Sequence, residues 1–248
     1  MSDEFPQLGA IPSPPDERDA DYHLATIALP VKPALPVTIP NMPVVWDQGQ
    51  TGTCVGHGVG EAICIALYKK LGYWIAPTAA DGEVLARDLY LNTTGDSTLS
   101  KGADIRSALK VAATTGVVGR TRGGIRQRFK IASYHTLLPS ADVQGTIESA
   151  LAGGMAVIAG LRWPKNWMLR DIPFDTLPDP PANEPEAGGH CVIFWRAVQK
   201  HPAAGSTALR VDDDLRNSWG LAFGPGGSAY VNHDTVVQRA FDLWTVQA

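Results

Sequence analysis

One cysteine of this sequence stands where a thiol becomes reactive. Cys54 follows a glycine-bearing segment, residues 48–53, and opens an apolar stretch with helical spacing. The positive end of a helix dipole favours the thiolate form of a cysteine at that position. Gln48 can aim its amide at the same place, and with the Cys54 backbone N–H it would make a two-donor oxyanion site. A buried structural cysteine is the plainer interpretation of most cysteines, but it explains neither the glycines nor the glutamine.

A thiolate nucleophile needs a base, and the base needs a group that orients its ring. His190 follows Gly188 and Gly189 and opens an apolar segment, so its ring is expected at the rim of a sheet. Asn217 follows another expected strand, where its amide oxygen can accept from an imidazole while Trp219 keeps water away. Taken singly, such a histidine or asparagine is usually structural. The order Gln, Cys, His, Asn along the chain is what makes the set specific.

A second histidine competes for the role of base. His57 lies three residues after Cys54. One helical turn beyond the nucleophile, its ring should point into the protein. We therefore expect His190, and not His57, to be the base.

Helices are expected mainly in the first half of the chain. Apolar residues recur at three- and four-residue steps over 54–71, 81–92, 104–113 and 142–151. Thr53 is expected to cap the first of these helices, and Gly72 to end it.

Strands are expected mainly in the second half. The predicted strands are 129–134, 155–163, 189–198, 208–217, 228–232 and 242–246. Residues 164–187 hold six prolines and should form a long loop of the kind that borders a site. Helices come first and mostly strands follow, which predicts an α+β chain with a helical lobe and a sheet lobe.

The first 40 residues are expected to form an extended arm. Nine of the 19 prolines lie between Pro6 and Pro43, and proline lacks the amide donor that helices and sheets need. We expect a loosely attached arm rather than a dedicated inhibitory segment, because chain ends are usually loosely held. The catalytic domain is then 41–248, with the helical lobe mainly in 41–116 and the β lobe mainly in 117–248.

Composition excludes several classes of protein. The 248 residues are 44% hydrophobic and 19% charged, as in ordinary globular proteins. The net charge of −4 argues against a nucleic-acid partner, and the five bases between Arg120 and Lys130 are expected to be a solvated face. No apolar run approaches the ~20 residues of a membrane-spanning helix, and the N-terminus has no secretory signal pattern. Three scattered cysteines favour neither a disulfide framework nor a zinc site, and we expect no cofactor.

At these residues the chain resembles the papain-like (C1) cysteine peptidases, especially compact bacterial and viral members without the long prodomain. The resemblance rests on three blocks: Gln48-Gly49 with Gly52-Thr53-Cys54, Gly189-His190, and Asn217-Ser218-Trp219-Gly220. Weaker similarity is found at Lys101-Gly102, Tyr230-Val231 and Asp242-Leu243-Trp244. The resemblance therefore runs from about residue 41 to residue 248.

The resemblance implies a papain-like fold, with the active site in a cleft between a helical lobe and an antiparallel β-barrel-like lobe. It implies that Cys54 is the nucleophile, His190 the general base and then acid, and Asn217 the group that orients His190. Gln48 would be an oxyanion donor, and Cys54 and His190 would rest as a thiolate–imidazolium pair. The reaction would be peptide hydrolysis through an acyl-enzyme. The residues expected to bind substrate are Gly52, Gly102, Gly188, Gly189, Cys191 and Trp219.

Two departures from the family pattern carry information. Thr51 stands where secreted members have a disulfide cysteine, and Val55 stands where an aromatic residue is usual. The missing disulfide partner indicates a reducing compartment, so we expect a cytoplasmic or virion-associated protein with Cys64 and Cys191 as free packing residues. The expected partner is a peptide or protein substrate, with no membrane and with association in a larger assembly left open.

Two other functions stay open on the sequence alone. A thiol-dependent amidase or transpeptidase could use the same triad, although the Asn217 block differs from cell-wall hydrolases with Cys–His sites. A structural component of a viral or bacterial assembly could have the papain fold with little proteolysis. The intact set of Gln48, Cys54, His190 and Asn217 argues against a decayed enzyme, because packing does not demand all four.

Overall fold

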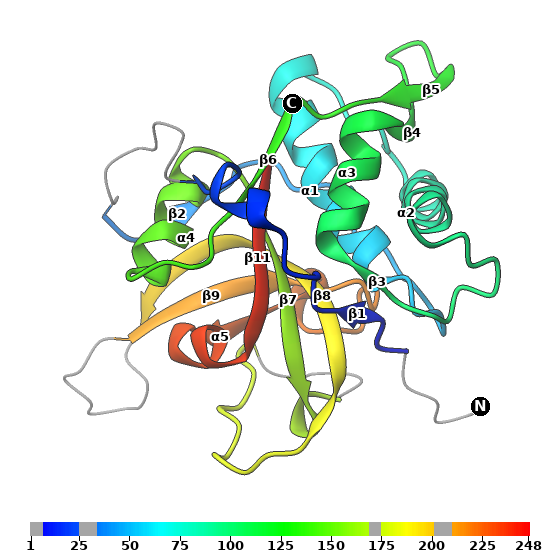
Figure 1. Ribbon diagram of the computed structural model, residues 1–248. Helices are drawn as coiled ribbons and strands as arrows, with labels where there is room; N and C mark the ends of the chain where they lie inside the picture. The colour runs from blue at the N-terminus through cyan, green and yellow to red at the C-terminus, as the bar shows by residue number, and fades with distance from the viewer. Residues whose placement is uncertain (1–6, 25–33, 169–174, 201–209) are drawn as a thin grey trace.

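The structure is a computed structural model of the chain. It describes residues 7–24, 34–168, 175–200 and 210–248. Helices α1 to α3 form one side of the molecule, and a long antiparallel sheet forms the other (Figure 1). The predicted division into a helical part and a sheet part is confirmed. None of the helices in the described ranges combines the length and apolarity needed to cross a membrane.

The four helices predicted from the sequence, α1 to α4, begin and end close to the predicted positions, and the structure adds a short fifth helix. They are α1 (Cys54–Leu71), α2 (Ala79–Thr94), α3 (Ile105–Thr114), α4 (Val143–Ala152) and α5 (His233–Arg239). The Asp104 side chain accepts from the Ser107 N–H and starts α3, and Asp142 starts α4 in the same way. Gly72 ends α1 in the left-handed conformation, with φ of 71°.

The large sheet carries the second half of the chain. Its strands are β6 (Ser133–Thr136), β7 (Val157–Pro164), β8 (Glu186–Lys200), β9 (Arg210–Arg216), β10 (Ser228–Asn232) and β11 (Ala240–Gln247). They are hydrogen-bonded in the order β10-β9-β8-β7-β11-β6, and β2 (Val37–Thr38) also pairs with β8. Every pairing in this sheet is antiparallel. The antiparallel pairing of β8 with β9, in which Ile193 lies opposite Arg216, therefore brings His190 and Asn217 to one end of neighbouring strands.

Two glycines let α1 lie directly between α2 and β8. A Cβ on Gly58 would lie 2.7 Å from Cys191 Sγ, and one on Gly56 would collide with the Ala86 carbonyl. Residues of α1 are buried on nearly every side through its first three turns. The helix that begins at Cys54 is thus fixed against both the helical part and the sheet.

Two local predictions are corrected by the structure, and one short helix was not predicted. The single strand over 129–134 is wrong: β5 ends at Phe129 and β6 begins at Ser133, because the chain leaves the β4–β5 hairpin and joins the large sheet. This hairpin consists of β4 (Val117–Arg120) and β5 (Arg126–Phe129). Helix α5 has only seven residues, too few for a periodic apolar pattern. The arm is extended at β1 (Ala10–Ile11), but Glu17–Ala20 forms a short 3-10 turn.

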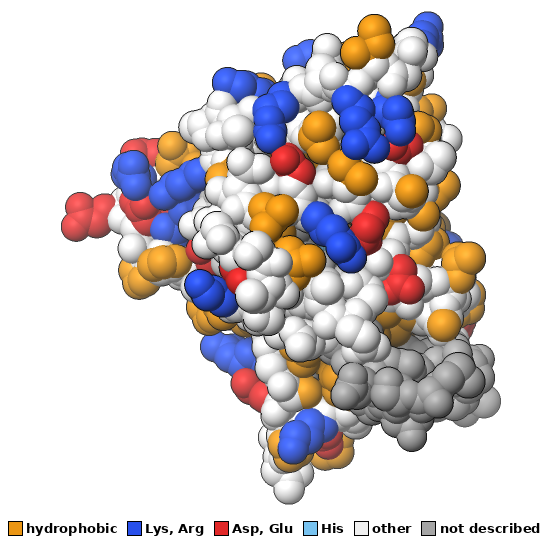
Figure 2. Space-filling model, turned by 90° about the vertical axis from the view of Figure 1, so that its right-hand side faces the viewer, with side chains coloured by type: hydrophobic (Ala, Val, Ile, Leu, Met, Phe, Trp, Pro, Cys, Tyr) orange, Lys and Arg blue, Asp and Glu red, His pale blue; other side chains and the backbone are white. Residues whose placement is uncertain are grey.

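The basic segment between Arg120 and Lys130 lies on the hairpin and is largely paired. Arg120 contacts Asp81 at 2.6 Å, and Arg128 contacts Asp88 at 2.9 Å. Figure 2 shows Lys and Arg side chains at the top of that face with acidic groups beside them. The positive charge of this segment is therefore largely balanced by the acids of α2.

Candidate active site

Cys54 is the first residue of α1 and is fully buried. Thr53 occupies the N-cap position as predicted, but its side chain makes no capping hydrogen bond. Burial raises the pKa of the Cys54 thiol to about 11. In this covered state the thiol is protonated near neutral pH, despite its place at the positive end of the helix.

His190 and Asn217 are joined directly. His190 Nε2 lies 2.8 Å from Asn217 Oδ1, which also accepts the Ser218 backbone N–H at 2.8 Å. Since Asn217 Oδ1 is an acceptor in both contacts, Nε2 must carry the ring proton. The other ring nitrogen, Nδ1, has no hydrogen-bond partner among the described residues. The asparagine thus fixes the tautomer and leaves a lone pair on Nδ1 to act as a base.

Aromatic rings enclose the His190–Asn217 hydrogen bond. The ring centre of Trp219 lies 5.0 Å from that of His190, and Trp163 lies at 4.7 Å in an edge-on arrangement. Burial lowers the pKa of His190 to about 4, although the bond to Asn217 acts in the opposite direction. The contact between Trp163 and His190 could not be predicted from the sequence, because it depends on how β7 and β8 pair.

The Gln48 side chain has a fixed orientation. Its Oε1 accepts from the Ser218 hydroxyl at 2.6 Å, so its Nε2 must be the donor group. One donated bond goes to the Thr51 carbonyl at 2.6 Å, and the other goes to the Gln7 carbonyl at 3.0 Å. The Gln48 amide, which is predicted to donate to an oxyanion, therefore donates to a backbone carbonyl of the arm instead.

The arm runs through the site next to Gly102. The Ala103 N–H donates to the Gly9 carbonyl at 2.8 Å. Beyond it, Ala10–Ile11 pairs in parallel with Ala103–Asp104, which form β1 and β3. The arm thus adds an extended strand to an edge of the helical part, as a bound peptide would.

Four rim glycines predicted to bind substrate all lie against the arm: Gly52, Gly102, Gly188 and Gly189. A Cβ on Gly102 would lie 2.5 Å from the Gly9 carbonyl oxygen, and one on Gly188 would lie 3.2 Å from Leu8 Cβ. A Cβ on Gly189 would collide with the Ala10 carbonyl, and one on Gly9 would collide with the Gly52 carbonyl. The absence of side chains at these positions lets residues 8–10 lie flat across the site. Cys191, also predicted to bind substrate, is buried beside Cys54 under this segment.

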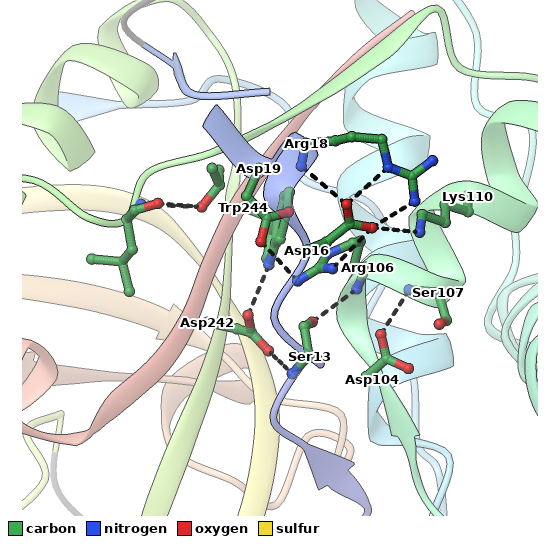
Figure 3. Close-up of polar contacts among 12 residues, drawn as sticks. Ser13, Asp16, Arg18, Asp19, Asp104, Arg106, Ser107, Lys110, Asp242 and Trp244 are labelled. Carbon is green, nitrogen blue, oxygen red and sulfur yellow. Dashed lines mark hydrogen bonds and ion pairs between the residues drawn. The ribbon is translucent and has the colours of Figure 1, made fainter. Parts of the chain in front are cut away.

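Ion pairs and hydrogen bonds hold the next part of the arm (Figure 3). Arg106 of α3 contacts Asp19 at 3.0 Å and Asp16 at 3.5 Å, and Lys110 contacts Asp16 at 3.4 Å. On the other side, the Ser13 N–H donates to Asp242 Oδ2 at 2.8 Å. The arm is therefore attached to both the helical part and the sheet.

The structure thus differs from the expectation of a loosely attached arm. Leu24 and Ala10 are buried, and the acids of the arm face bases of α3. Proline content alone does not show these contacts, because they depend on residues about 90 positions away in sequence. The thiolate–imidazolium pair implied by the resemblance is not favoured in this covered state, since the pKa of Cys54 is raised and that of His190 is lowered.

The described residues bring together Cys54, His190, Asn217 and Gln48 with the glycines of the rim; their catalytic roles stay predictions. The same residues contain no group of three or more His, Cys, Asp or Glu side chains that could hold a metal ion. Cys54, Cys64 and Cys191 are all free and buried.

Comparisons with known proteins give a match at the level of structure. No family model matches the sequence, and no curated protein matches it. Xylellain, a cysteine protease from Xylella fastidiosa, superposes with a TM-score of 0.72 at 20% identity and covers 100% of this chain and 99% of its own. Procathepsin B S9 from Trypanosoma congolense gives 0.66 at 11% identity, over 97% of this chain and 87% of its own. Procathepsin L 3 from Tenebrio molitor gives a TM-score of 0.65 at 14% identity, over 92% of this chain and 73% of its own. The chain therefore has the papain-like fold that the sequence predicts.

Proposed function

We propose that this chain is a cysteine peptidase that hydrolyses peptide bonds through an acyl-enzyme. His190 Nδ1 takes the thiol proton, and Cys54 Sγ attacks the carbonyl carbon of the scissile bond. Gln48 Nε2 donates to the oxyanion that forms, and His190 then protonates the leaving amine as the C–N bond breaks. A water molecule deprotonated by His190 attacks the thioester, which releases the acid and restores the thiol.

The hydrogen bond between His190 and Asn217 carries this proposal. It fixes the ring in the one tautomer that leaves Nδ1 free as a base, in a setting that water cannot easily enter. The unpartnered Nδ1 of His190 is the atom that can take the thiol proton, because the next residue, Cys191, lies beside Cys54. The fold shared with a protein named a cysteine protease supports the same conclusion.

The covered site indicates that the arm must move before a substrate can bind. Residues 7–10 take the Gln48 donor and cover the rim glycines, so the chain as described has no room for a peptide there. Two of the similar structures are named procathepsins, which are precursor forms. We propose that the arm inhibits the peptidase until it is displaced.

The test is labelling with an electrophilic epoxide probe. A Gly9→Val substitution should displace the arm, because the new side chain would collide with the Gly52 backbone. We expect one label per chain in this variant, its loss with Cys54→Ala, and strongly slowed labelling with His190→Ala. Labelling that persists after Cys54→Ala, or a labelled protein that cleaves no peptide from a broad library, would contradict the peptidase.

A further inference from the structure

A continuous chain of hydrogen bonds links the loop before Cys54 to helix α2. In order, its atoms are the Gln48 carbonyl, Thr51 Oγ1, Thr53 Oγ1, His57 Nδ1 and Nε2, and Glu83 Oε2. His57 is 1% exposed and lies one helical turn after Cys54. The proposed reaction makes no use of this histidine, so its buried position needs an explanation.

Each hydroxyl group in this series of hydrogen bonds has one proton to donate, and this fixes the direction of each bond. Thr51 Oγ1 donates its one proton to the Gln48 carbonyl at 2.7 Å. The contact between Thr51 Oγ1 and Thr53 Oγ1, at 2.7 Å, must therefore be donated by Thr53. Thr53 then has no proton left for His57. Both oxygens that face His57 Nδ1, the Thr53 carbonyl at 3.0 Å and the Thr53 hydroxyl at 3.3 Å, are thus acceptors. Nδ1 must carry a proton.

The other ring nitrogen of His57 also faces an acceptor. Nε2 lies 3.0 Å from Glu83 Oε2. Glu83 Oε1 accepts from Arg87 Nε at 2.6 Å, so the carboxyl is paired with a guanidinium independently of His57. Burial acts to raise the pKa of Glu83, but its hydrogen bonds and ion pairs lower it overall. The carboxylate is therefore ionised and can only accept, so Nε2 carries a proton as well.

We propose that His57 is held as a buried imidazolium that favours the thiolate of Cys54 and fixes the loop that carries Gln48. This role rests on the proposed function, in which Cys54 is the nucleophile. His57 touches no reacting atom and is a positioning residue. Its charge lies one turn along the helix from the thiol, at a distance where side chains of residues i and i+3 are neighbours.

The charges around His57 leave an excess of positive charge beside Cys54. On the α2 side, the His57 ring faces Glu83, and the second carboxylate oxygen of Glu83 accepts from Arg87. Its own helix contributes Glu61, which is paired at 3.1 Å with Arg216 of β9. Together these groups are two carboxylates, two guanidiniums and the imidazolium, which sum to one positive charge. The titratable groups nearby, on α1 and β8, are Cys54 and His190, and a fixed cation opposes protonation of the latter.

The first experiment measures the protonation of His57 directly. NMR of the full chain with ¹⁵N-labelled histidine should show both ring nitrogens of His57 protonated at pH 7, with the signal assigned by its loss in His57→Gln. Glu83→Gln should convert this ring to a neutral form at the same pH. A neutral tautomer in the wild-type chain would overturn the proposal, whatever the protein is found to catalyse.

The second experiment measures the effect on the thiol. In the Gly9→Val background, the pH dependence of iodoacetamide alkylation gives the pKa of Cys54 without any need for hydrolysis. His57→Gln should raise that pKa by about one unit, which is about a tenfold slower alkylation below both pKa values. Glu83→Gln should shift it in the same direction, and it serves as the second variant if His57→Gln does not fold.

The matched control is Asp88→Asn, which removes a carboxylate from the same helix that pairs with Arg128 instead. It should leave the Cys54 pKa unchanged. An unchanged thiol pKa in folded His57→Gln would overturn the proposal. A failure of the peptidase looks different, because the alkylation profiles would then shift as expected while no peptide is cleaved.

Discussion

The amide of Gln48 donates to the backbone carbonyl of Gln7 at 3.0 Å. This bond places a carbonyl group of the protein's own arm on the donor proposed for the oxyanion. Because residues 8–10 then lie along the rim glycines, the arm and a substrate compete for one surface. The strength with which the arm is held therefore sets how much of the protein is open.

Displacing the arm should expose the thiol. Gly9→Val is expected to raise the rate of epoxide labelling at least about tenfold, which corresponds to a loss of about 1.4 kcal/mol in arm binding. The measurement is the labelling rate at pH 7 followed by mass spectrometry. Gly123→Val is the matched control, because a Cβ there meets only Thr121 Oγ1 at 3.8 Å. Equal rates in the two variants would show that the arm does not limit access.

Weakening the ion pairs of the arm should loosen its attachment. Asp16→Asn removes the charge that faces Arg106 at 3.5 Å and Lys110 at 3.4 Å. We expect faster cleavage of the arm by a low concentration of trypsin, with Asp234→Asn on α5 as a control. Hydrogen bonds with Arg18 inside the arm, and to a smaller extent the contact with Lys110, hold the pKa of Asp16 well below its usual range. The stability that its charge contributes is present above the unfolded pKa and is lost as the pH falls through the folded value, and only the part due to Lys110 concerns attachment of the arm. Cleavage that is no faster than in the control would show that these ion pairs do not hold the arm.

Asn217 should matter for turnover more than for the reactivity of the thiol towards small probes. In the Gly9→Val background, Asn217→Ala is expected to lower kcat by about a hundredfold, because His190 loses the acceptor that fixes its tautomer. The assay is hydrolysis of a fluorogenic peptide. Asn92→Ala, on the exposed side of α2, should leave kcat unchanged. Wild-type turnover by Asn217→Ala would contradict the orienting role.

Arg216 should be required for stability. Its guanidinium donates to Glu61 at 3.1 Å and to the carbonyls of Pro43 and Gly226 at 2.6 Å each, all with little exposure. Arg216→Ala leaves a buried carboxyl whose pKa burial already raises, and we expect a loss of about 3 to 5 kcal/mol in the free energy of unfolding. Urea denaturation measures this loss. Arg128→Ala breaks a more exposed ion pair and should cost no more than about 1 kcal/mol.

The buried histidine predicts a pH dependence of stability. The pKa of His190 falls from an ordinary value near 6.5 to about 4 in the folded chain, so the unfolded chain takes up the proton first. The contribution of the uncharged His190 to the free energy of unfolding is fully present above pH 6.5 and is lost as the pH falls towards 4. Between pH 7.5 and 4.5 it amounts to about 2 kcal/mol. His190→Gln should therefore lose less stability over this range than the wild-type chain in urea denaturation. Equal losses of stability in the two proteins would show that His190 is not the source of the pH dependence.

The sequence predicts the elements of the site well because their signals are local. The periodicity of residues 54–71 defines α1 at both ends, and Gly72 has the conformation that ends it. His190 opens the apolar part of β8, and Asn217 directly follows β9, a strand with three acidic residues. Their meeting could be expected from the resemblance alone, because β8 and β9 are joined by a connection that carries no pairing signal.

The features missed by sequence reasoning depend on contacts between distant residues. The path of the arm follows from Gly9 meeting Ala103, and from Asp16 and Asp19 meeting Arg106. Their only local signals are small residues at 9 and 10 and acids after them. His57 was expected to point into the protein, which it does, but the ionised partner on α2 could not be read from spacing.

The hold on the arm comes from two kinds of contact that respond differently to the solvent. Residues 8–10 present one small side chain after Leu8 and bind largely through backbone groups, which dissolved salt hardly affects. Asp16 and Asp19 bind through partly exposed charges, whose attraction to Arg106 weakens as the salt concentration rises. Ionic strength should therefore tune the fraction of open sites gradually, without any cut in the chain, and the same protein would be more active in a concentrated electrolyte than in a dilute one.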